Sequence, residues 1–342
     1  MHTMRIKTII GAIMTWGGML LSGCLNQDAV FADSEDMVVT HVYTGPNTPI
    51  GEFANLYLYL TGENQPGHQR EPVTDPAQLP YFSQPDEEWV KAQGLKVSYD
   101  TVCGHCVCRI APREGEKRYV LYLHGGYYVN NMMRIQYNLI KPFVEELGMG
   151  VLIPDYPLCA AYTYQDAYRM IAEVYWNSVQ ELGGSENILL FGDSAGGGLC
   201  LGFAQWLHET GWEQPYSILL LSPWLDVTLT NPDIALIDDP MLNRAYAQRV
   251  GVLWAGGENE TMRYEVSPVY GSLEGLPRVH VIIGGRDMLY PDVVRLRAKM
   301  RAAQLPLTVY EYPQLFHDFP AVPELPESKD AYRWFVEIAR GR

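Results

Sequence analysis

Short apolar runs alternate with longer amphipathic stretches along most of the chain after residue 94. The short runs are rich in β-branched and aromatic residues and end at Gly, Pro or polar residues, which is typical of buried strands. The predicted strands are 119–123, 150–153, 188–191, 217–221, 279–283 and 307–312, and the predicted helices are 132–147, 164–182, 195–209, 291–303 and 330–340. This alternation predicts an α/β fold with a mostly parallel, twisted sheet that is covered by helices on both faces.

Two segments depart from this rhythm. Residues 24–93 are rich in Pro, Gly, Asn, Gln and Asp and contain only short amphipathic pieces, so we assign them to a linker and a cap. Residues 231–257 contain a further helix, at 240–254, and no strand. An insertion at the end of a strand overhangs the edge of the sheet where ligands bind. We therefore expect a main domain over 94–342 with a cap insertion at about 231–257.

The first residues have the pattern of an export signal. Arg5 and Lys7 precede an apolar run over 8–21, and two small residues then lead to Cys24. This pattern predicts a secretory signal over 1–23, because the run is too short to span a bilayer comfortably. Its end, Leu-Ser-Gly-Cys, resembles the bacterial lipobox, in which the Cys is lipidated and becomes the first mature residue. We expect an extracytoplasmic lipoprotein anchored through Cys24; an ordinary signal peptide with secretion, or an uncleaved anchor, is the alternative.

Composition and charge narrow the possible partners. The chain has 342 residues, of which 47% are hydrophobic and 19% charged, as in a packed globular enzyme. Its formal net charge of −15 argues against nucleic acid and anionic membrane surfaces as partners, because either would need a basic patch. A lipid anchor is therefore the only membrane contact that we expect, and the sequence indicates no particular oligomeric state.

A cluster of cysteines suggests a metal site but does not fit one. The segment 103–108 contains Cys103, Cys106 and Cys108, yet no second Cys/His pair answers it to complete four zinc ligands. We predict instead a hairpin, with strands at 95–99 and 106–110 and its turn at Gly104-His105. A Cys103–Cys106 or Cys103–Cys108 disulfide is compatible with an exported protein. The pairing stays open among the cysteines of the predicted mature domain: Cys103, Cys106, Cys108, Cys159 and Cys200.

The segment Gly-Asp-Ser-Ala-Gly at 192–196 follows a predicted strand and leads into a predicted helix. This is the G-x-S-x-G pattern in the context of strand, sharp turn and helix, where the Ser hydroxyl is presented above the sheet. The flanking glycines remove side chains that would clash in so tight a bend. The helix N-terminus directs free N–H groups towards developing negative charge. The pattern predicts that Ser194 is a nucleophile.

The end of the strand at 119–123 predicts the oxyanion donors. The sequence His124-Gly125-Gly126 follows it, and a glycine pair lets main-chain N–H groups approach an acyl oxygen closely. We expect the N–H groups of Gly125 and Gly126 to bind the oxyanion, together with that of Ala195.

A Ser hydroxyl needs a His to take its proton, and a carboxylate orients that His. On such sheets the order along the chain is Ser, acid, His. Asp287 follows the strand at 279–283, and His317 follows the strand at 307–312. We expect these two residues to complete a catalytic triad, with Asp292 and Asp318 as the alternative acids.

These motifs together resemble the hormone-sensitive-lipase-like family of α/β-hydrolases, which includes bacterial acetyl esterases and carboxylesterases. The matching pieces are His124-Gly125-Gly126, Asp155-Tyr156, 192–197, 222–226, Ser267-Pro268, 284–289 and His317. They span roughly residue 94 to the C-terminus. The resemblance implies an α/β-hydrolase fold with a helical cap, and it implies the same triad and oxyanion donors as above. Tyr127 stands where this family often has a third glycine.

The predicted function is that of a serine carboxylesterase, which hydrolyses small-molecule esters through an acyl-enzyme and needs no metal or organic cofactor. Tyr127, Tyr128 and Trp224 are expected to form a compact aromatic pocket, which favours short, acetyl-type acyl groups. Two alternatives remain. One is an amidase or peptidase with the same triad, and the other is a non-catalytic ligand-binding protein on a hydrolase scaffold.

The lipobox predicts a covalent lipid on Cys24. When cells that express the chain are fed radiolabelled palmitate, the label is expected in the wild-type protein and not in Cys24→Ser. An unlabelled wild type, or equal label in both proteins, would contradict the anchor.

Overall fold

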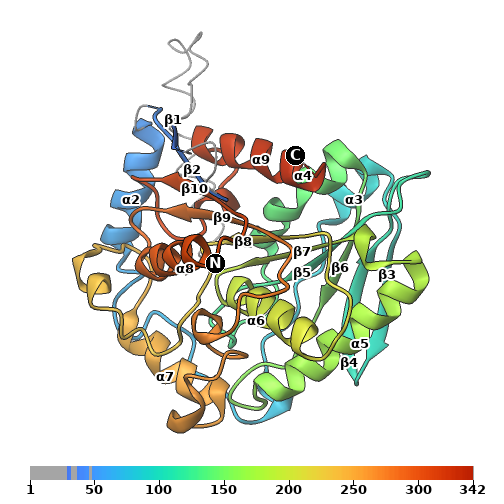
Figure 1. Cartoon of the computed structure of the whole chain (residues 1–342), viewed down its shortest axis with the longest axis horizontal. Coiled ribbons are helices and arrows are strands. Elements are labelled where there is room, and N and C mark those ends of the chain that lie inside the picture. Colours follow the sequence, from blue (N-terminus) through green and yellow to red (C-terminus); the bar gives the residue numbers. More distant parts are fainter. Residues whose placement is uncertain (1–28, 32–36, 46–47, 342) are drawn as a thin grey trace.

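The fold is built on one large sheet (Figure 1). The computed structural model describes residues 29–31, 37–45 and 48–341, so the predicted signal segment 1–23 and Cys24 lie outside the described residues. Within the described residues the sheet has ten strands, in the order β1-β2-β10-β9-β8-β7-β5-β6-β4-β3. Their bounds are β1 Ala29–Phe31, β2 Val38–Val42, β3 Val97–Val102, β4 His105–Ile110, β5 Tyr119–Leu123, β6 Gly150–Pro154, β7 Ile188–Asp193, β8 Ser217–Leu221, β9 Arg278–Gly284 and β10 Leu307–Tyr312.

The strands from β2 to β6 in this order run parallel, while β1 and β4 pair with their neighbours in the antiparallel sense. Every residue of β5, β6, β7 and β8 is buried. Continuous apolar runs of this kind are expected of parallel strands that are covered on both faces. The predicted α/β fold with a mostly parallel sheet is therefore confirmed.

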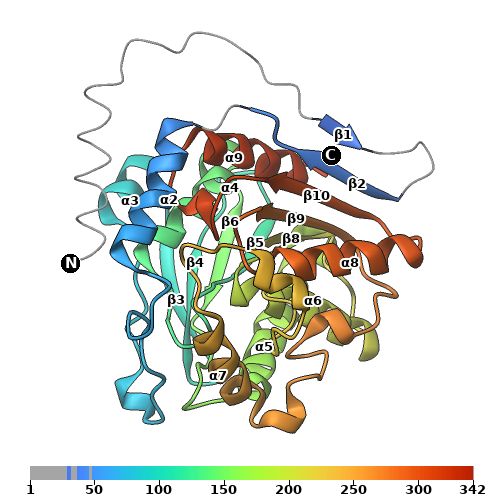
Figure 2. The same ribbon diagram turned by 90° about the vertical axis from the view of Figure 1, so that its left-hand side faces the viewer.

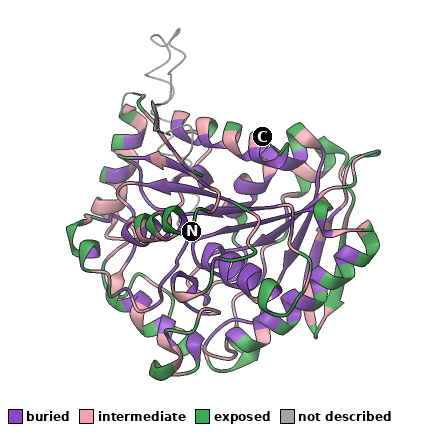
Figure 3. Ribbon diagram, in the orientation of Figure 1, coloured by how far each residue is buried: buried purple, intermediate pink, exposed green. Residues whose placement is uncertain are grey.

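Helices cover both faces of the sheet (Figures 1 and 3). The helices α4 Tyr137–Leu147 and α9 Pro326–Ala339 pack on one face, where the rings of Phe143 and Phe335 stack with centroids 5.7 Å apart. The helices α5 Tyr164–Leu182, α6 Ala195–Glu209 and α8 Tyr290–Ala302 pack on the other face. Within the described ranges no helix is long and apolar enough to cross a membrane.

The helix boundaries have local causes, and α5 is an example. Thr163 and Asp166 form a reciprocal capping box at its N-terminus, which satisfies two backbone N–H groups that the helix leaves free. Gly183 ends the helix in a left-handed conformation with φ 77°, which glycine adopts without a side-chain clash. Both ends coincide with those predicted for 164–182.

The N-terminal segment differs from the expectation of a linker and cap alone. The strand β2 lies parallel to β10, and β1 pairs with β2, so the sheet continues past β10 (Figure 2). Val38 is fully buried there. The sequence did not predict β2, because five residues amid polar segments give too short a pattern. The hydrogen bonds that hold this strand come from β10, which is distant in the sequence. The same segment also contains the helices α2 Pro49–Thr61 and α3 Glu87–Gln93.

The insertion near 231–257 contains the short helix η4 Pro232–Leu236 and the helix α7 Arg244–Ala255, and no strand. Asn243 caps α7, because its side chain accepts a hydrogen bond from the N–H of Tyr246 (2.8 Å). The helix thus begins four residues later than the predicted start at 240.

The cysteine segment forms the predicted hairpin of β3 and β4, with its turn at Cys103 and Gly104, one residue earlier than predicted. The thiols of Cys103, Cys106, Cys108, Cys159 and Cys200 are all free, so neither of the two possible disulfides is present. The reason is orientation: the Cys103 thiol points to the Glu173 carboxylate of α5, with Sγ and Oε2 3.1 Å apart. Among the described residues no three His, Cys, Asp or Glu side chains are arranged to hold a metal ion.

Candidate active site

Ser194 occupies a sharp turn between β7 and α6. Its backbone has φ 53° and ψ −121°, a conformation that costs a non-glycine residue about 1–3 kcal/mol. The flanking glycines make the turn possible: a Cβ on Gly192 would lie 2.4 Å from the Gly196 carbonyl oxygen, and one on Gly196 would lie 1.9 Å from the Leu123 oxygen. The N–H of Ser194 donates to the Leu221 oxygen of β8 (2.8 Å), which fixes the turn to the sheet.

His317 follows β10 and Asp287 follows β9, and their side chains meet. Nδ1 of His317 lies 2.8 Å from Oδ2 of Asp287, while Oδ1 of Asp287 accepts a hydrogen bond from the N–H of Leu289 (2.9 Å). Both side chains are buried, as is Ser194. This contact orients the imidazole in the way that a general base requires.

Neither of the two alternative acids contacts Nδ1 of His317. Asp292 accepts a hydrogen bond from the side-chain amide of Asn231 (2.9 Å). Asp318 lies on the other side of the imidazole, with its Oδ2 3.1 Å from Nε2 of His317. Asp287 is therefore the carboxylate on Nδ1, as the sequence predicts.

The charge around the imidazole favours its protonated form. Burial lowers the pKa of His317, but the adjacent carboxylates of Asp287 and Asp318 outweigh burial and hold that pKa well above the usual range. The free site thus stabilises a proton on this ring.

The carboxylate of Asp193, next to Ser194, holds the turn at 124–127 after β5, which is called the oxyanion turn below. Oδ1 accepts hydrogen bonds from the N–H of Gly125 (2.9 Å) and from the hydroxyl of Tyr122, and Oδ2 accepts one from Nε2 of Gln136 (2.8 Å). Asp193 stands at a variable position of G-x-S-x-G, to which the pattern itself assigns no role. A charged residue in a turn that must be buried was the signal for a structural role.

This contact corrects one predicted oxyanion donor. The N–H of Gly125 already donates to Asp193, so it is not available to an acyl oxygen. Gly126 and Tyr127 follow it and line the same cavity as Ser194. The backbone of Gly126 has φ 119°, a value that favours glycine. Ala195 begins α6, where the first N–H groups of a helix have no partner within it.

Ser194 and His317 open on one cavity of about 460 Å³. The helix α2 supplies much of its apolar wall, and Met241 and Leu242 of the insertion supply another part. The apolar lining residues are Ile50, Phe53, Ala54, Tyr57, Leu58, Met133, Ile135, Met241, Leu242, Phe316, Ala321 and Val322. Glu63, His68 and Arg70 contribute polar groups.

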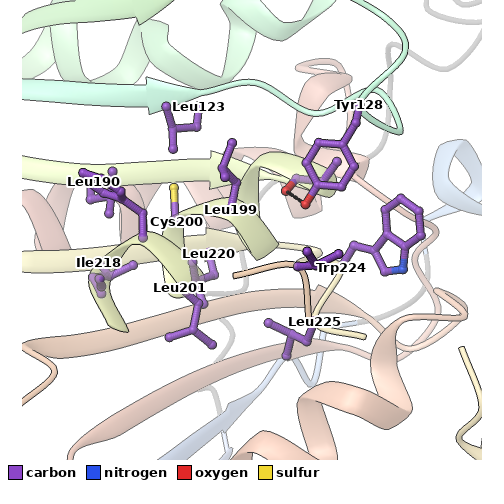
Figure 4. Packing of buried hydrophobic residues seen from close by; sticks show 14 of the residues in the cluster. Leu123, Tyr128, Leu190, Leu199, Cys200, Leu201, Ile218, Leu220, Trp224 and Leu225 are labelled. Atoms are coloured by element: carbon purple, nitrogen blue, oxygen red, sulfur yellow. Dashed lines mark hydrogen bonds between the residues drawn. The ribbon is translucent and has the colours of Figure 1, made fainter. Parts of the chain in front are cut away.

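The expected aromatic pocket is only partly present. Tyr127 lines the cavity, but Tyr128 and Trp224 are 1% and 2% exposed and belong to the hydrophobic core (Figure 4). Their rings stack with centroids 5.6 Å apart, and the Tyr128 hydroxyl donates to the oxygen of Ala195 (2.8 Å). Both rings point into the core, and Tyr128 contacts the start of α6 through its hydroxyl.

Tyr127, in the place of the third glycine, joins the oxyanion turn to the insertion. Its hydroxyl accepts a hydrogen bond from the N–H of Asn243 (3.3 Å), and its ring packs edge-on against Tyr246 at 5.1 Å. The insertion and the oxyanion turn are therefore joined through this side chain.

Asp239, which belongs to no motif of the sequence, fixes the insertion beside Asp287. Its carboxylate accepts hydrogen bonds from the N–H groups of Met241 (2.7 Å) and Leu242 (2.9 Å), and from that of Met288 (2.8 Å) next to Asp287. Burial, with the nearby charge of Asp287, raises the pKa of Asp239 to about 6.

The helix α2 contacts the loops that contain His317 and Asp287. Asn55 donates from Nδ2 to the oxygen of Gln314 (2.9 Å), close to His317 in sequence. Arg286 donates to the hydroxyl of Tyr59 (2.7 Å). The helix α2 thus contacts the loop of the base, His317, and the loop of the acid, Asp287.

A family model described as alpha/beta hydrolase fold matches residues 120–321, which is more than half of the chain. The chain belongs to this family. The match covers the Ser194 turn at 192–196, the oxyanion turn, Asp287 and His317 in one continuous segment.

Named relatives agree with this assignment. The hydrolase is 30% identical over 247 residues to the esterase LipU of Mycobacterium tuberculosis, a match that covers 68% of this chain and 80% of that protein. It is 27% identical over 240 residues to an acetyl-hydrolase of Streptomyces hygroscopicus, covering 69% and 79%. A crystal structure of an esterase from the bacterial hormone-sensitive lipase family superposes with a TM-score of 0.71 and 25% identity, covering 86% of this chain and 98% of that one. The resemblance found from the motifs is confirmed.

The hydrogen bonds of Asp193 predict an effect on turnover. Asp193→Ala in this hydrolase is expected to lower kcat about a hundredfold with little change in KM, because the oxyanion turn loses its anchor and its donors move. Asp193→Asn, which keeps an acceptor for Gly125 and Tyr122, is expected to retain more activity than the Ala variant. Steady-state kinetics and urea unfolding of both variants measure this, and equal kcat losses in the two would contradict the anchoring role.

Proposed function

We propose that the protein is a serine carboxylesterase. The observation that carries this proposal is the shared cavity of Ser194 and His317, with Asp287 on the far side of the imidazole. A nucleophile on a strained turn, a base and an orienting acid are the parts that acyl transfer requires. The names of the relatives, an esterase and an acetyl-hydrolase, favour an ester as the substrate.

The reaction follows from the positions of these groups. Oγ of Ser194 attacks the ester carbonyl carbon, and its proton passes to Nε2 of His317, while Asp287 stabilises the imidazolium that forms. We assign the binding of the oxyanion to the N–H groups of Gly126, Tyr127 and Ala195. The imidazolium then protonates the leaving alcohol, and water hydrolyses the acyl-enzyme by the reverse sequence.

The cavity favours a short acyl group that is larger than acetyl. Its volume of about 460 Å³ and its mainly aliphatic wall leave room beyond a two-carbon chain, since Tyr128 and Trp224 do not fill it. Each further buried methylene contributes about 0.8 kcal/mol until the wall is reached. We therefore propose esters of short linear acids as substrates.

The location is part of the same proposal. The signal pattern over 1–23 and the lipobox at Cys24 support an enzyme outside the cytoplasm, tethered by lipid, with secretion as the alternative.

A series of p-nitrophenyl esters tests the function. We expect kcat/KM to rise about fourfold per methylene from acetyl to butanoyl or hexanoyl, and to fall for palmitoyl, because the palmitoyl chain and the p-nitrophenyl group together exceed the cavity. Ser194→Ala is expected to abolish hydrolysis of every member.

The matched anilides of the same acids provide the comparison between classes. Faster hydrolysis of anilides than of esters would favour an amidase. No hydrolysis of either series by the wild type, with normal binding of the acids, would favour a ligand-binding protein. Unchanged activity in Ser194→Ala would contradict the assigned nucleophile.

A further inference from the structure

The imidazole of His317 has a carboxylate on each side. Nδ1 lies 2.8 Å from Oδ2 of Asp287, and Nε2 lies 3.1 Å from Oδ2 of Asp318. The esterase mechanism uses Asp287 alone and needs Nε2 to take the proton of Ser194. The Asp318 contact therefore occupies the nitrogen atom on which the reaction depends.

The backbone holds Asp318 in this place. Its N–H donates to Oγ of Ser222 (3.1 Å), and Ser222 is fully buried. Its φ of 52° lies in the left-handed region, which Asp and Asn tolerate better than most residues. The side chain is 14% exposed and lines the cavity that contains Ser194. Its orientation towards Nε2 is thus built into the turn after His317.

The other carboxylate oxygen argues against a role in stability alone. Oδ1 of Asp318 is buried and has no hydrogen-bond partner within the part of the chain that the structure describes. An unpaired buried polar atom costs about 1–3 kcal/mol, so its presence calls for a reason. Contact with the reacting nitrogen of His317 supplies one.

The groups around His317 and Asp318 favour a proton on this pair. Burial raises the pKa of the Asp318 carboxyl to about 7, while the charge of His317 opposes that rise and the carboxylates around it add to it. The acidic groups that face the pair from the surrounding elements are Asp193 of β7, Asp287 of the loop after β9, Asp239 of the insertion and Tyr122 of β5.

We propose that Asp318 is a further catalytic residue, whose carboxylate binds the proton on Nε2 of His317 in the resting enzyme and competes with Ser194 for that nitrogen. The inference rests on the proposed function, because it assigns a role within the same reaction. It also makes Asp318 the group that sets the pH at which the base becomes available.

The proton has a defined route. From the imidazolium it passes to Oδ2 of Asp318, which leaves a neutral carboxyl and a lone pair on Nε2, and the carboxyl then releases it to water in the cavity. Oγ of Ser194 can now give its own proton to Nε2 as it attacks the ester. The carboxylate of Asp318 stabilises the imidazolium that forms at this step. At low pH it therefore lowers the fraction of neutral His317, and during attack it makes His317 a stronger base.

The pH profile of kcat/KM tests this role with Asp318→Asn, which keeps the size of the side chain and tolerates the left-handed backbone. Without the carboxylate the pKa of His317 falls, so more of the imidazole is neutral at low pH. We expect the acid limb to move down by about one pH unit, which is about a tenfold gain near the foot of the limb relative to the plateau. The plateau itself is expected to fall, because a weaker base accepts the Ser194 proton.

Two more variants keep the result interpretable. Asp233→Asn removes an exposed charge in η4 that does not face His317, and its profile is expected to match that of the wild type. Asp318→Gly also accepts a positive φ and removes the whole carboxyl, so it is expected to shift the limb in the same direction as Asp318→Asn. An unmoved or raised acid limb in both Asp318 variants, with urea unfolding like that of the wild type, would overturn the proposal.

Proton NMR gives a readout that does not depend on turnover. At about pH 6 the wild type is expected to show two downfield ring N–H protons of His317, one bound to each carboxylate, and in Asp318→Asn the Nε2 proton is expected to move upfield, because a neutral amide oxygen accepts a weaker hydrogen bond than a carboxylate does. The same two resonances at the same positions in the wild type and in Asp318→Asn would overturn the proposal. Absence of ester hydrolysis in the wild type would instead contradict the proposed function, and the NMR result would still decide the contact.

Discussion

The close packing of the Ser194 turn against the end of β5 is the constraint on which the site depends. A Cβ on Gly196 would lie 1.9 Å from the Leu123 oxygen, and one on Gly125 would lie 2.8 Å from Cβ of Ser194. Any side chain at these positions would separate the nucleophile from the oxyanion turn. The strained backbone of Ser194 is held by the sheet and by α6, and the Asp193 carboxylate joins both turns with its own hydrogen bonds.

Asp287 and His317 lie on loops that the insertion and α2 hold in place. Asp239 connects the insertion to the loop of Asp287, and α2 contacts the loops on either side. This arrangement gathers several carboxylates around one buried imidazole. Their combined charge keeps His317 protonated more readily than a free histidine, which makes the supply of a neutral base a controlled step of the proposed reaction.

Much of the fold could be predicted from the sequence, because buried parallel strands and long amphipathic helices carry their own patterns. The bounds of β5, β8, β10, α5 and α6 coincide with the predicted ones. The strand β2 could not be predicted, since its pairing comes from a distant segment. The pattern also placed Ser194, Asp287 and His317 after strands that the structure contains as β7, β9 and β10. It could not show that Gly125 donates to Asp193, because such a choice depends on side-chain directions in three dimensions.

The central claim is that Ser194 is the nucleophile of this cavity. Labelling of the purified protein with a fluorophosphonate, followed by peptide mass spectrometry, tests it most directly. The account predicts one covalent adduct, on the peptide that contains Ser194, and no adduct in Ser194→Ala. An adduct on another residue, or equal labelling of the variant, would contradict it.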